Sequence, residues 1–143
     1  MGQIAESALE KLRAERNETL RLLLGLTEEE CRIRWQGGNV NHELRNFASH
    51  YMDHMQHLNK ILRHQNRWFT EAELLLQQAQ ALHGELETMV LSLSDQEMSV
   101  PGPDEGDWNA LQVIEHMASN ERMYRQRILE NLPADRSPAP ATS

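Results

Sequence analysis

The stretch Val40–His64, VNHELRNFASHYMDHMQHLNKILRH, decides the fold of this 143-residue chain. Its large apolar side chains recur every three or four residues, and at ~100° per residue they fall within about 80° of one another on a helix. They are Leu44, Phe47, Tyr51, Met55, Leu58 and Leu62. The spacing predicts an amphipathic α-helix over 40–64 with one face turned toward a core.

The same stretch holds a stripe of histidines. Five of the seven histidines in the chain lie between positions 42 and 64, and His50, His54 and His57 follow one another at spacings of four and three. On a helix this spacing lines up the three imidazoles beside the apolar face. Imidazole is a common metal ligand and proton carrier, so the stripe indicates a metal or proton-handling site. Ordinary hydrogen bonding at the edge of a core is the alternative.

Helical spacing continues through most of the remaining chain. Further helices are expected over 3–24, over 70–90 from a capping box at its start, and over 108–131. The loop 101–106 combines two prolines with two glycines and is expected to be non-helical. No segment alternates as a half-buried strand does, and the loop 35–39 is expected to lead into the 40–64 helix without one. The sequence therefore predicts an all-α fold.

Two halves of the chain match each other in order and length. Leu26–Glu30 corresponds to Leu93–Glu97, 67 residues later, and His50 corresponds to His116, 66 residues later. A duplicated helical hairpin of this kind predicts a four-helix bundle with a pseudo-two-fold internal repeat, over residues 1–132. Residues 133–143, rich in proline and small side chains, are expected to form a disordered C-terminal tail.

The amino-acid composition narrows the classes of partner that we expect for the chain. Acidic residues outnumber basic ones 22 to 14, and the formal charge of −8 argues against nucleic-acid binding. The chain shows neither a signal peptide nor an apolar run long enough for a membrane span, so we expect a cytoplasmic protein without a membrane partner. The lone Cys31 is expected to be a small, buried or half-buried side chain.

The 108–131 helix carries a carboxylate in an unexpected position. Glu121 falls in the middle of its apolar face, with His116 on the flank and Asn120 one turn later. A carboxylate there needs a partner, because burying an isolated charge is costly. A metal, a histidine or an arginine would serve, and a buried salt bridge is as good an interpretation as a ligand role.

Two motifs resemble a known family. Trp108–Met117, WNALQVIEHM, with Glu121 beyond it, is similar to the tryptophan-led histidine segment of the DinB/YfiT-like superfamily. His50–Leu58, HYMDHMQHL, resembles that superfamily's second motif, with histidines four residues apart. The resemblance runs from the first helix to about Leu132 and implies a four-helix bundle.

The resemblance also implies a metal centre. In the family, three histidines from two helices hold a divalent metal such as nickel or zinc, and the matching residues here are His50, His54 and His116. The order of the motifs is exchanged, because the family carries its lone-histidine motif in the second helix and its paired motif in the fourth.

Some relatives resemble metal-dependent thiol transferases, in which the metal binds a low-molecular-weight thiol that attacks a small electrophilic substrate. Residues that would orient ligands or move a proton in such a reaction are Asp53, His57 and Glu121. The alternative is a non-enzymatic bundle that binds a small apolar ligand or a partner protein, its histidines being structural. A homodimer is expected in either case.

Overall fold

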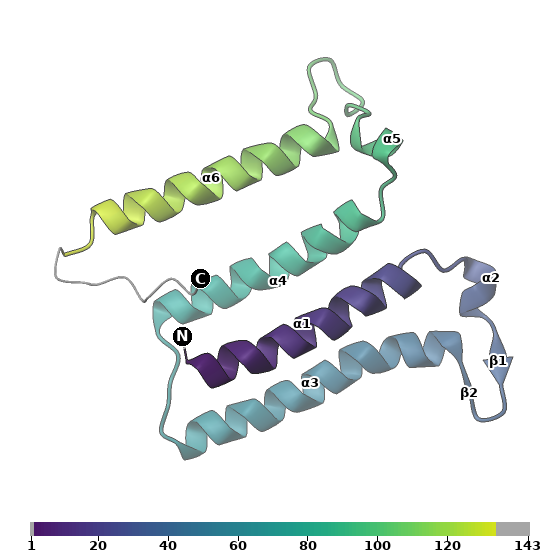
Figure 1. Ribbon diagram of the computed structural model, residues 1–143, viewed down its shortest axis with the longest axis horizontal. Coiled ribbons are helices and arrows are strands. Elements are labelled where there is room, and N and C mark those ends of the chain that lie inside the picture. Colours follow the sequence, from purple (N-terminus) through teal and green to yellow (C-terminus); the bar gives the residue numbers. More distant parts are fainter. Residues whose placement is uncertain (1, 134–143) are drawn as a thin grey trace. The chain divides into compact units, whose positions relative to one another are not determined.

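The computed structural model describes residues 2–133 of the chain (Figure 1). Four long helices and two single-turn helices make up most of this range, which confirms the all-α prediction. The elements are α1 (Gln3–Leu23), α2 (Glu28–Cys31), β1 (Arg34–Trp35), β2 (Gly38–Asn39), α3 (Val40–His64), α4 (Glu71–Leu91), α5 (Asp95–Met98) and α6 (Ala110–Glu130). The tail predicted for residues 133–143 lies, apart from Pro133, outside the described residues.

The helix ends follow the capping residues in the sequence. α3 begins at Val40 and ends at His64, as its apolar spacing predicts. α4 begins after Thr70, whose hydroxyl oxygen accepts the Glu73 N–H at 3.2 Å, so the capping box predicted there is present. α6 begins at Ala110, two residues later than predicted, because Asn109 caps the helix from an extended conformation.

The described residues divide into two compact units. One unit, Thr19–Glu87, contains α2, both strands and α3. The other contains residues 2–18 and 88–133, with α5 and α6. Each unit holds one short helix that leads through a connecting segment into a long helix. We call residues 27–45 the first corner and residues 94–115 the second corner.

Both corners open with a complete capping box. In the first, the Thr27 hydroxyl accepts the Glu30 N–H at 3.2 Å, and the Glu30 carboxylate accepts the Thr27 N–H at 2.8 Å. In the second, Ser94 and Glu97 make the same two bonds at 3.3 and 2.8 Å. These reciprocal bonds satisfy N–H groups that a helix start leaves without partners, and so fix where each short helix begins.

A two-stranded hairpin in the first corner corrects the expectation of no strand. Arg34 pairs with Asn39, and Trp35 pairs with Gly38, in antiparallel register. Two residues per strand are too few to show the alternation by which strands are recognised. A Cβ on Gly38 would lie 3.0 Å from the Trp35 ring, so the glycine allows that ring to lie against the opposite strand.

The second corner makes the same return with a longer loop. Pro101 and Asn109 form an antiparallel bridge, and the Gly102 N–H donates to the Trp108 carbonyl at 3.2 Å. Within the loop, the Asp107 carboxylate accepts the Asp104 N–H at 3.0 Å. Arg34 and Pro101 therefore occupy matching places, each opposite the asparagine that caps the next long helix.

These asparagines fix the register between the two halves. The side-chain oxygen of Asn39 accepts the His42 N–H at 2.8 Å, and that of Asn109 accepts the Gln112 N–H at 2.9 Å. Counted from these caps, positions on α3 and α6 match 70 residues apart, not the 66 that relates His50 to His116. His116 therefore lies one helical turn nearer to its cap than His50 does.

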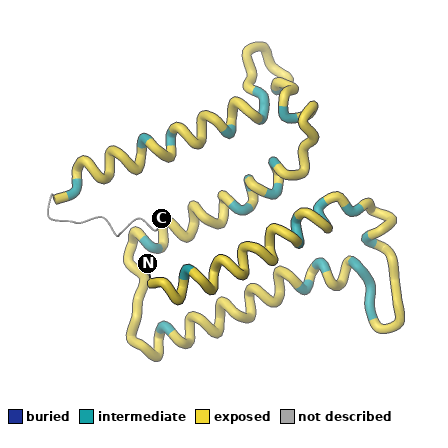
Figure 2. Tube along the Cα trace, viewed as in Figure 1, coloured by how far each residue is buried: buried dark blue, intermediate teal, exposed yellow. Residues whose placement is uncertain are grey.

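Within residues 2–133, no side chain is fully buried, and partly covered positions occur near the start of α3 (Figure 2). On the apolar face predicted for α3, Phe47 is 39% exposed and Met55 is 61% exposed. Leu44 and Leu62, nearer the two ends of that helix, are half-buried. No helix in this range has the length and apolar character that crossing a bilayer requires.

Candidate functional site

The three histidines of the predicted stripe lie side by side on α3. The ring centroids of His50 and His54 are 4.3 Å apart, with the planes at 79°, and those of His54 and His57 are 5.4 Å apart, at 59°. All three residues are exposed. Because the helix places successive histidines one turn apart, their rings meet without any contribution from another element.

The closest approach within the stripe joins two ring nitrogens. Nδ1 of His54 and Nδ1 of His57 are 3.4 Å apart, longer than a well-formed N–H···N hydrogen bond. Two imidazole nitrogens bound at about 2.0 to 2.1 Å to one tetrahedral Zn²⁺ are separated by about 3.4 Å. The spacing of this pair therefore fits two ligands of one metal ion.

Asp53 lies on the same helix, next to His54 in sequence. Its side chain is exposed and forms no hydrogen bond or ion pair with any residue that the structure describes. The carboxylate is thus free of competing partners within this range. The described contacts of the three imidazole rings are with one another and do not include Asp53.

His116, predicted as the third ligand, belongs to the other unit, and its neighbours there are on α6 and just before it. Nε2 of His116 and the amide nitrogen of Asn120 are 2.6 Å apart. The Trp108 ring lies against the imidazole, with centroids 4.7 Å apart and planes at 64°. An amide that donates to Nε2 leaves Nδ1 as the protonated nitrogen, so this histidine already has a local structural role.

Glu121 is exposed on α6 and makes no contact with another described side chain through hydrogen bonds or ion pairs. An exposed carboxylate keeps its hydration, so the partner expected for a buried one is not required. Across residues 2–133, no three histidine, cysteine, aspartate or glutamate side chains stand in positions to hold one metal together. The structure thus brings together His54 and His57, with His50 beside them.

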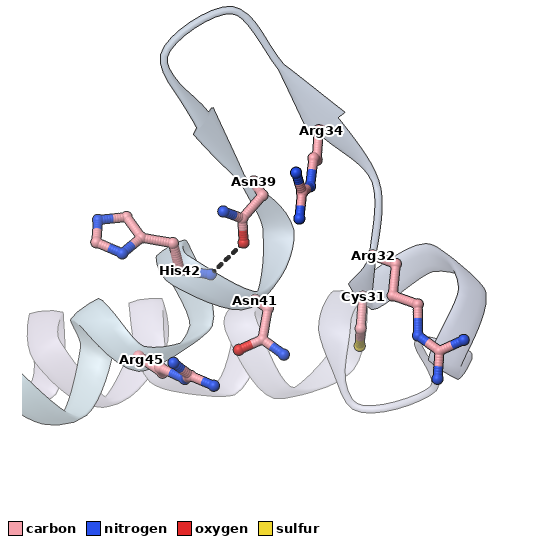
Figure 3. A pocket seen from close by; sticks show the side chains of 7 residues that line it. All are labelled: Cys31, Arg32, Arg34, Asn39, Asn41, His42 and Arg45. Carbon is pink, nitrogen blue, oxygen red and sulfur yellow. Dashed lines mark hydrogen bonds between the residues drawn. The ribbon is translucent and has the colours of Figure 1, made fainter.

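A pocket in the first corner was missed by the sequence analysis. Its volume is about 420 Å³, and it lies between α2, the hairpin and the start of α3 (Figure 3). The lining residues are Cys31, Arg32, Arg34, Asn39, Asn41, His42 and Arg45. The arginines are spread over 14 residues of an acidic chain, and only the return at the hairpin brings them to one place. The sequence feature that could have predicted the turn is the pair of glycines at 37 and 38. Gly37 has a φ of 99°, which glycine adopts readily in tight turns.

Comparisons of the chain with models of protein families, with curated proteins and with solved structures found no match.

Proposed function

We propose that this chain is a DinB-like protein that binds a divalent transition metal, nickel or zinc, through the histidine stripe of α3. His54 and His57 are the proposed ligand pair, and His50 is the neighbouring side chain on the same helix. The fold proposed for the whole chain is the four-helix bundle with an internal repeat. The part of His116 in metal binding stays a prediction from the family resemblance.

The 3.4 Å separation of the two Nδ1 atoms carries this proposal. A hydrogen bond at this length is weak, whereas two nitrogens bound to one tetrahedral metal ion have the same separation, which supports a shared role as metal ligands. Histidines three residues apart are held in this relation by the helix itself. A metal would therefore need to organise only side-chain rotamers, and no backbone movement.

The reaction class proposed for the site is thiol transfer to a small electrophile. A bound divalent metal would lower the pKa of a coordinated thiol and so supply the thiolate nucleophile. In the transfer, the thiol sulfur forms a bond to an electrophilic carbon, and the leaving group departs with its electron pair. The thiol proton passes to a base, for which the exposed imidazole of His50 is the candidate in this chain.

The test is a titration of the metal-free full-length chain, without a histidine tag, with Zn²⁺ by calorimetry and with Co²⁺ by absorption spectroscopy. We expect one metal per chain and a tetrahedral Co²⁺ spectrum. Replacing both ligands, His54→Asn with His57→Asn, should weaken binding at least about 100-fold, because a structural metal site loses several kcal/mol with its ligands.

The matched control is the pair His42→Asn with His64→Asn, which removes two histidines from the ends of the same helix. It should leave metal affinity unchanged. Absence of binding by the wild-type chain, or equal losses in the two double variants, would contradict the proposal. Circular dichroism of each variant separates loss of ligand from loss of helix.

A second candidate function follows from the bond between His116 and Asn120. A histidine satisfied within its own helix favours the alternative in which the histidines are structural and the bundle binds a small apolar ligand or partner protein as a homodimer. Sedimentation equilibrium of the full chain tests the dimer. Under this alternative, His50→Asn with His54→Asn changes thermal stability and leaves the dimer dissociation constant unchanged.

A further inference from the structure

The pocket of the first corner is positively charged within an acidic protein. Three arginines line it, from three successive segments of the chain, and none of the lining residues is acidic. The formal charge of the whole chain is −8. Three guanidinium groups around one pocket create a local positive potential that the composition as a whole does not suggest.

Nearby carboxylates leave most of this charge unpaired. Glu28 lies 3.7 Å from the Arg32 guanidinium, and both side chains are largely exposed, so this ion pair is weak. The Glu30 carboxylate is taken by the capping box, where it accepts bonds from Thr27. Arg34 and Arg45 have no ion-pair or hydrogen-bond partner among the described residues.

The polar side chains of the pocket add neutral donors to the charge. In Figure 3, the Asn41 amide lies between the side chains of Arg45 and Cys31, with Arg34 above it. The Asn39 oxygen is already committed to the His42 N–H, at 2.8 Å. Asn41 forms no hydrogen bond through its amide to another described residue, so its N–H groups are available to a ligand.

The second corner shows that this charge is not required by the backbone. Matched through the short helices and the caps, Arg32, Arg34 and Arg45 correspond to Ser99, Pro101 and Glu115. The same corner is thus built without arginine, and with a carboxylate at the place of Arg45. The three arginines of the first corner add charge where the fold needs none.

We propose that the first-corner pocket binds the phosphate group of a small phosphate ester, with Arg34 and Arg45 as the principal ligands and Asn41 as a neutral donor. Guanidinium groups bind phosphate oxygens through paired N–H groups, and one tetrahedral dianion accepts bonds from several directions at once. A single carboxylate carries one negative charge and so would balance the charge of only one arginine, whereas a phosphate dianion balances two.

The volume of about 420 Å³ leaves room beside the phosphate for a small organic group, as in ordinary small-molecule sites. A long nucleic acid would meet the acidic surface of the remaining chain, which opposes it. The pocket residues, 31–45, do not include the histidine stripe at 50–57, so this proposal and the metal proposal can fail separately.

The test is calorimetric titration of the full chain with inorganic phosphate and with phenyl phosphate, at low ionic strength to limit screening. We expect saturable binding of one equivalent, tighter for the ester. Arg34→Gln and Arg45→Gln should each weaken binding about tenfold, the loss typical of one charge-assisted hydrogen-bonding group. The control Arg125→Gln makes the same charge change on α6 and should leave the affinity unchanged.

Equal losses in Arg125→Gln and the pocket variants would overturn the proposal, because they would report the net charge alone. Unchanged affinity in Arg34→Gln and Arg45→Gln would overturn it as well. A single-stranded oligonucleotide that binds more tightly than phenyl phosphate, and that loses affinity in Arg125→Gln, would assign the arginines to a nucleic-acid surface instead. Circular dichroism confirms that each variant folds.

Discussion

The first and second corners share a backbone plan and differ in chemistry. Each begins with a capping box, returns through a short antiparallel pairing, and starts a long helix at a capping asparagine. The first then presents Arg34 and Arg45, where the second has Pro101 and Glu115. The caps and pairings set the path of the chain, while the side chains between them remain free to specify a ligand.

The long helices differ in the same way. In the register set by the two caps, His50 corresponds to Asn120, His54 to Tyr124 and His57 to Arg127. The histidine stripe therefore belongs to α3 alone, and in this register His116 does not correspond to any of its three histidines. One half of the chain carries both the proposed metal ligands and the basic pocket.

The largest effect is expected from converting one corner into the other. Arg45→Glu places a carboxylate where the second corner has Glu115, and it replaces attraction for phosphate with repulsion. We expect phosphate affinity to fall about 100-fold, twice the free-energy change of the neutral variant, because a favourable charge is both lost and reversed. Calorimetry at fixed ionic strength measures it.

The reciprocal variant, Glu115→Arg, is the control. It raises the net charge by as much as Arg45→Glu lowers it. The change lies in the second corner, where Ser99 and Pro101 stand in place of the other two arginines. It should create no second phosphate site. A stoichiometry of two in this variant would show that one arginine at the start of a helix is sufficient, and the contrast between the corners would be lost.

The positions of the helices were largely predictable from local signals. The apolar spacing of 40–64 gave both ends of α3, and the capping box at Thr70 gave the start of α4. These features depend on residues three or four apart, which sequence periodicity reports directly. The start of α6 was placed two residues early because the pairing of Asn109 with Pro101 joins residues across a loop.

The sites were predictable only in part, for the same physical reason. His54 and His57 meet because they share one helix, so their spacing sufficed. The pocket forms because a hairpin with two residues per strand brings Arg34 and Arg45 to one place. A strand pairing this short leaves no periodic pattern in the sequence by which it could be predicted. The predicted pairing of His50 with His116 placed the two long helices one turn out of register, because it aligned histidines and not the capping asparagines.

A smaller effect is expected from removing the capping asparagines. Asn39→Ala and Asn109→Ala each remove the acceptor for an N–H group at a helix start, which costs about 1 kcal/mol of unfolding free energy. Asn109→Ala should cost the more of the two, because the Asn109 amide also donates to the Ser99 carbonyl at 3.5 Å. Urea denaturation measures both.

Glycine at the same positions provides the control, since it serves as a cap at a cost of only a few tenths of a kcal/mol. Asn39→Gly and Asn109→Gly should therefore recover most of the lost stability. If alanine and glycine variants were equally unstable, the asparagines would act through contacts other than the cap. The equivalence of the two caps, and the 70-residue register drawn from it, would then lose its support.

The smallest effect concerns the carboxylates of the two capping boxes. The backbone N–H of Thr27, and then its hydroxyl, hold the pKa of Glu30 below its ordinary value of 4.5. Ser94 lowers the pKa of Glu97 through the same two bonds. Each lowered pKa means that the ionised form is favoured by folding.

The stabilisation by these carboxylates is therefore complete above pH 4.5 and is lost as the pH falls through the lower pKa of the folded state. We expect NMR titration to show midpoints below 4.5 for both Glu30 and Glu97. Thr27→Ala should raise the Glu30 midpoint alone, and Ser94→Ala that of Glu97 alone, because each box is closed within its own corner. A midpoint that responds to the substitution in the other corner would show that the two capping boxes titrate as one system.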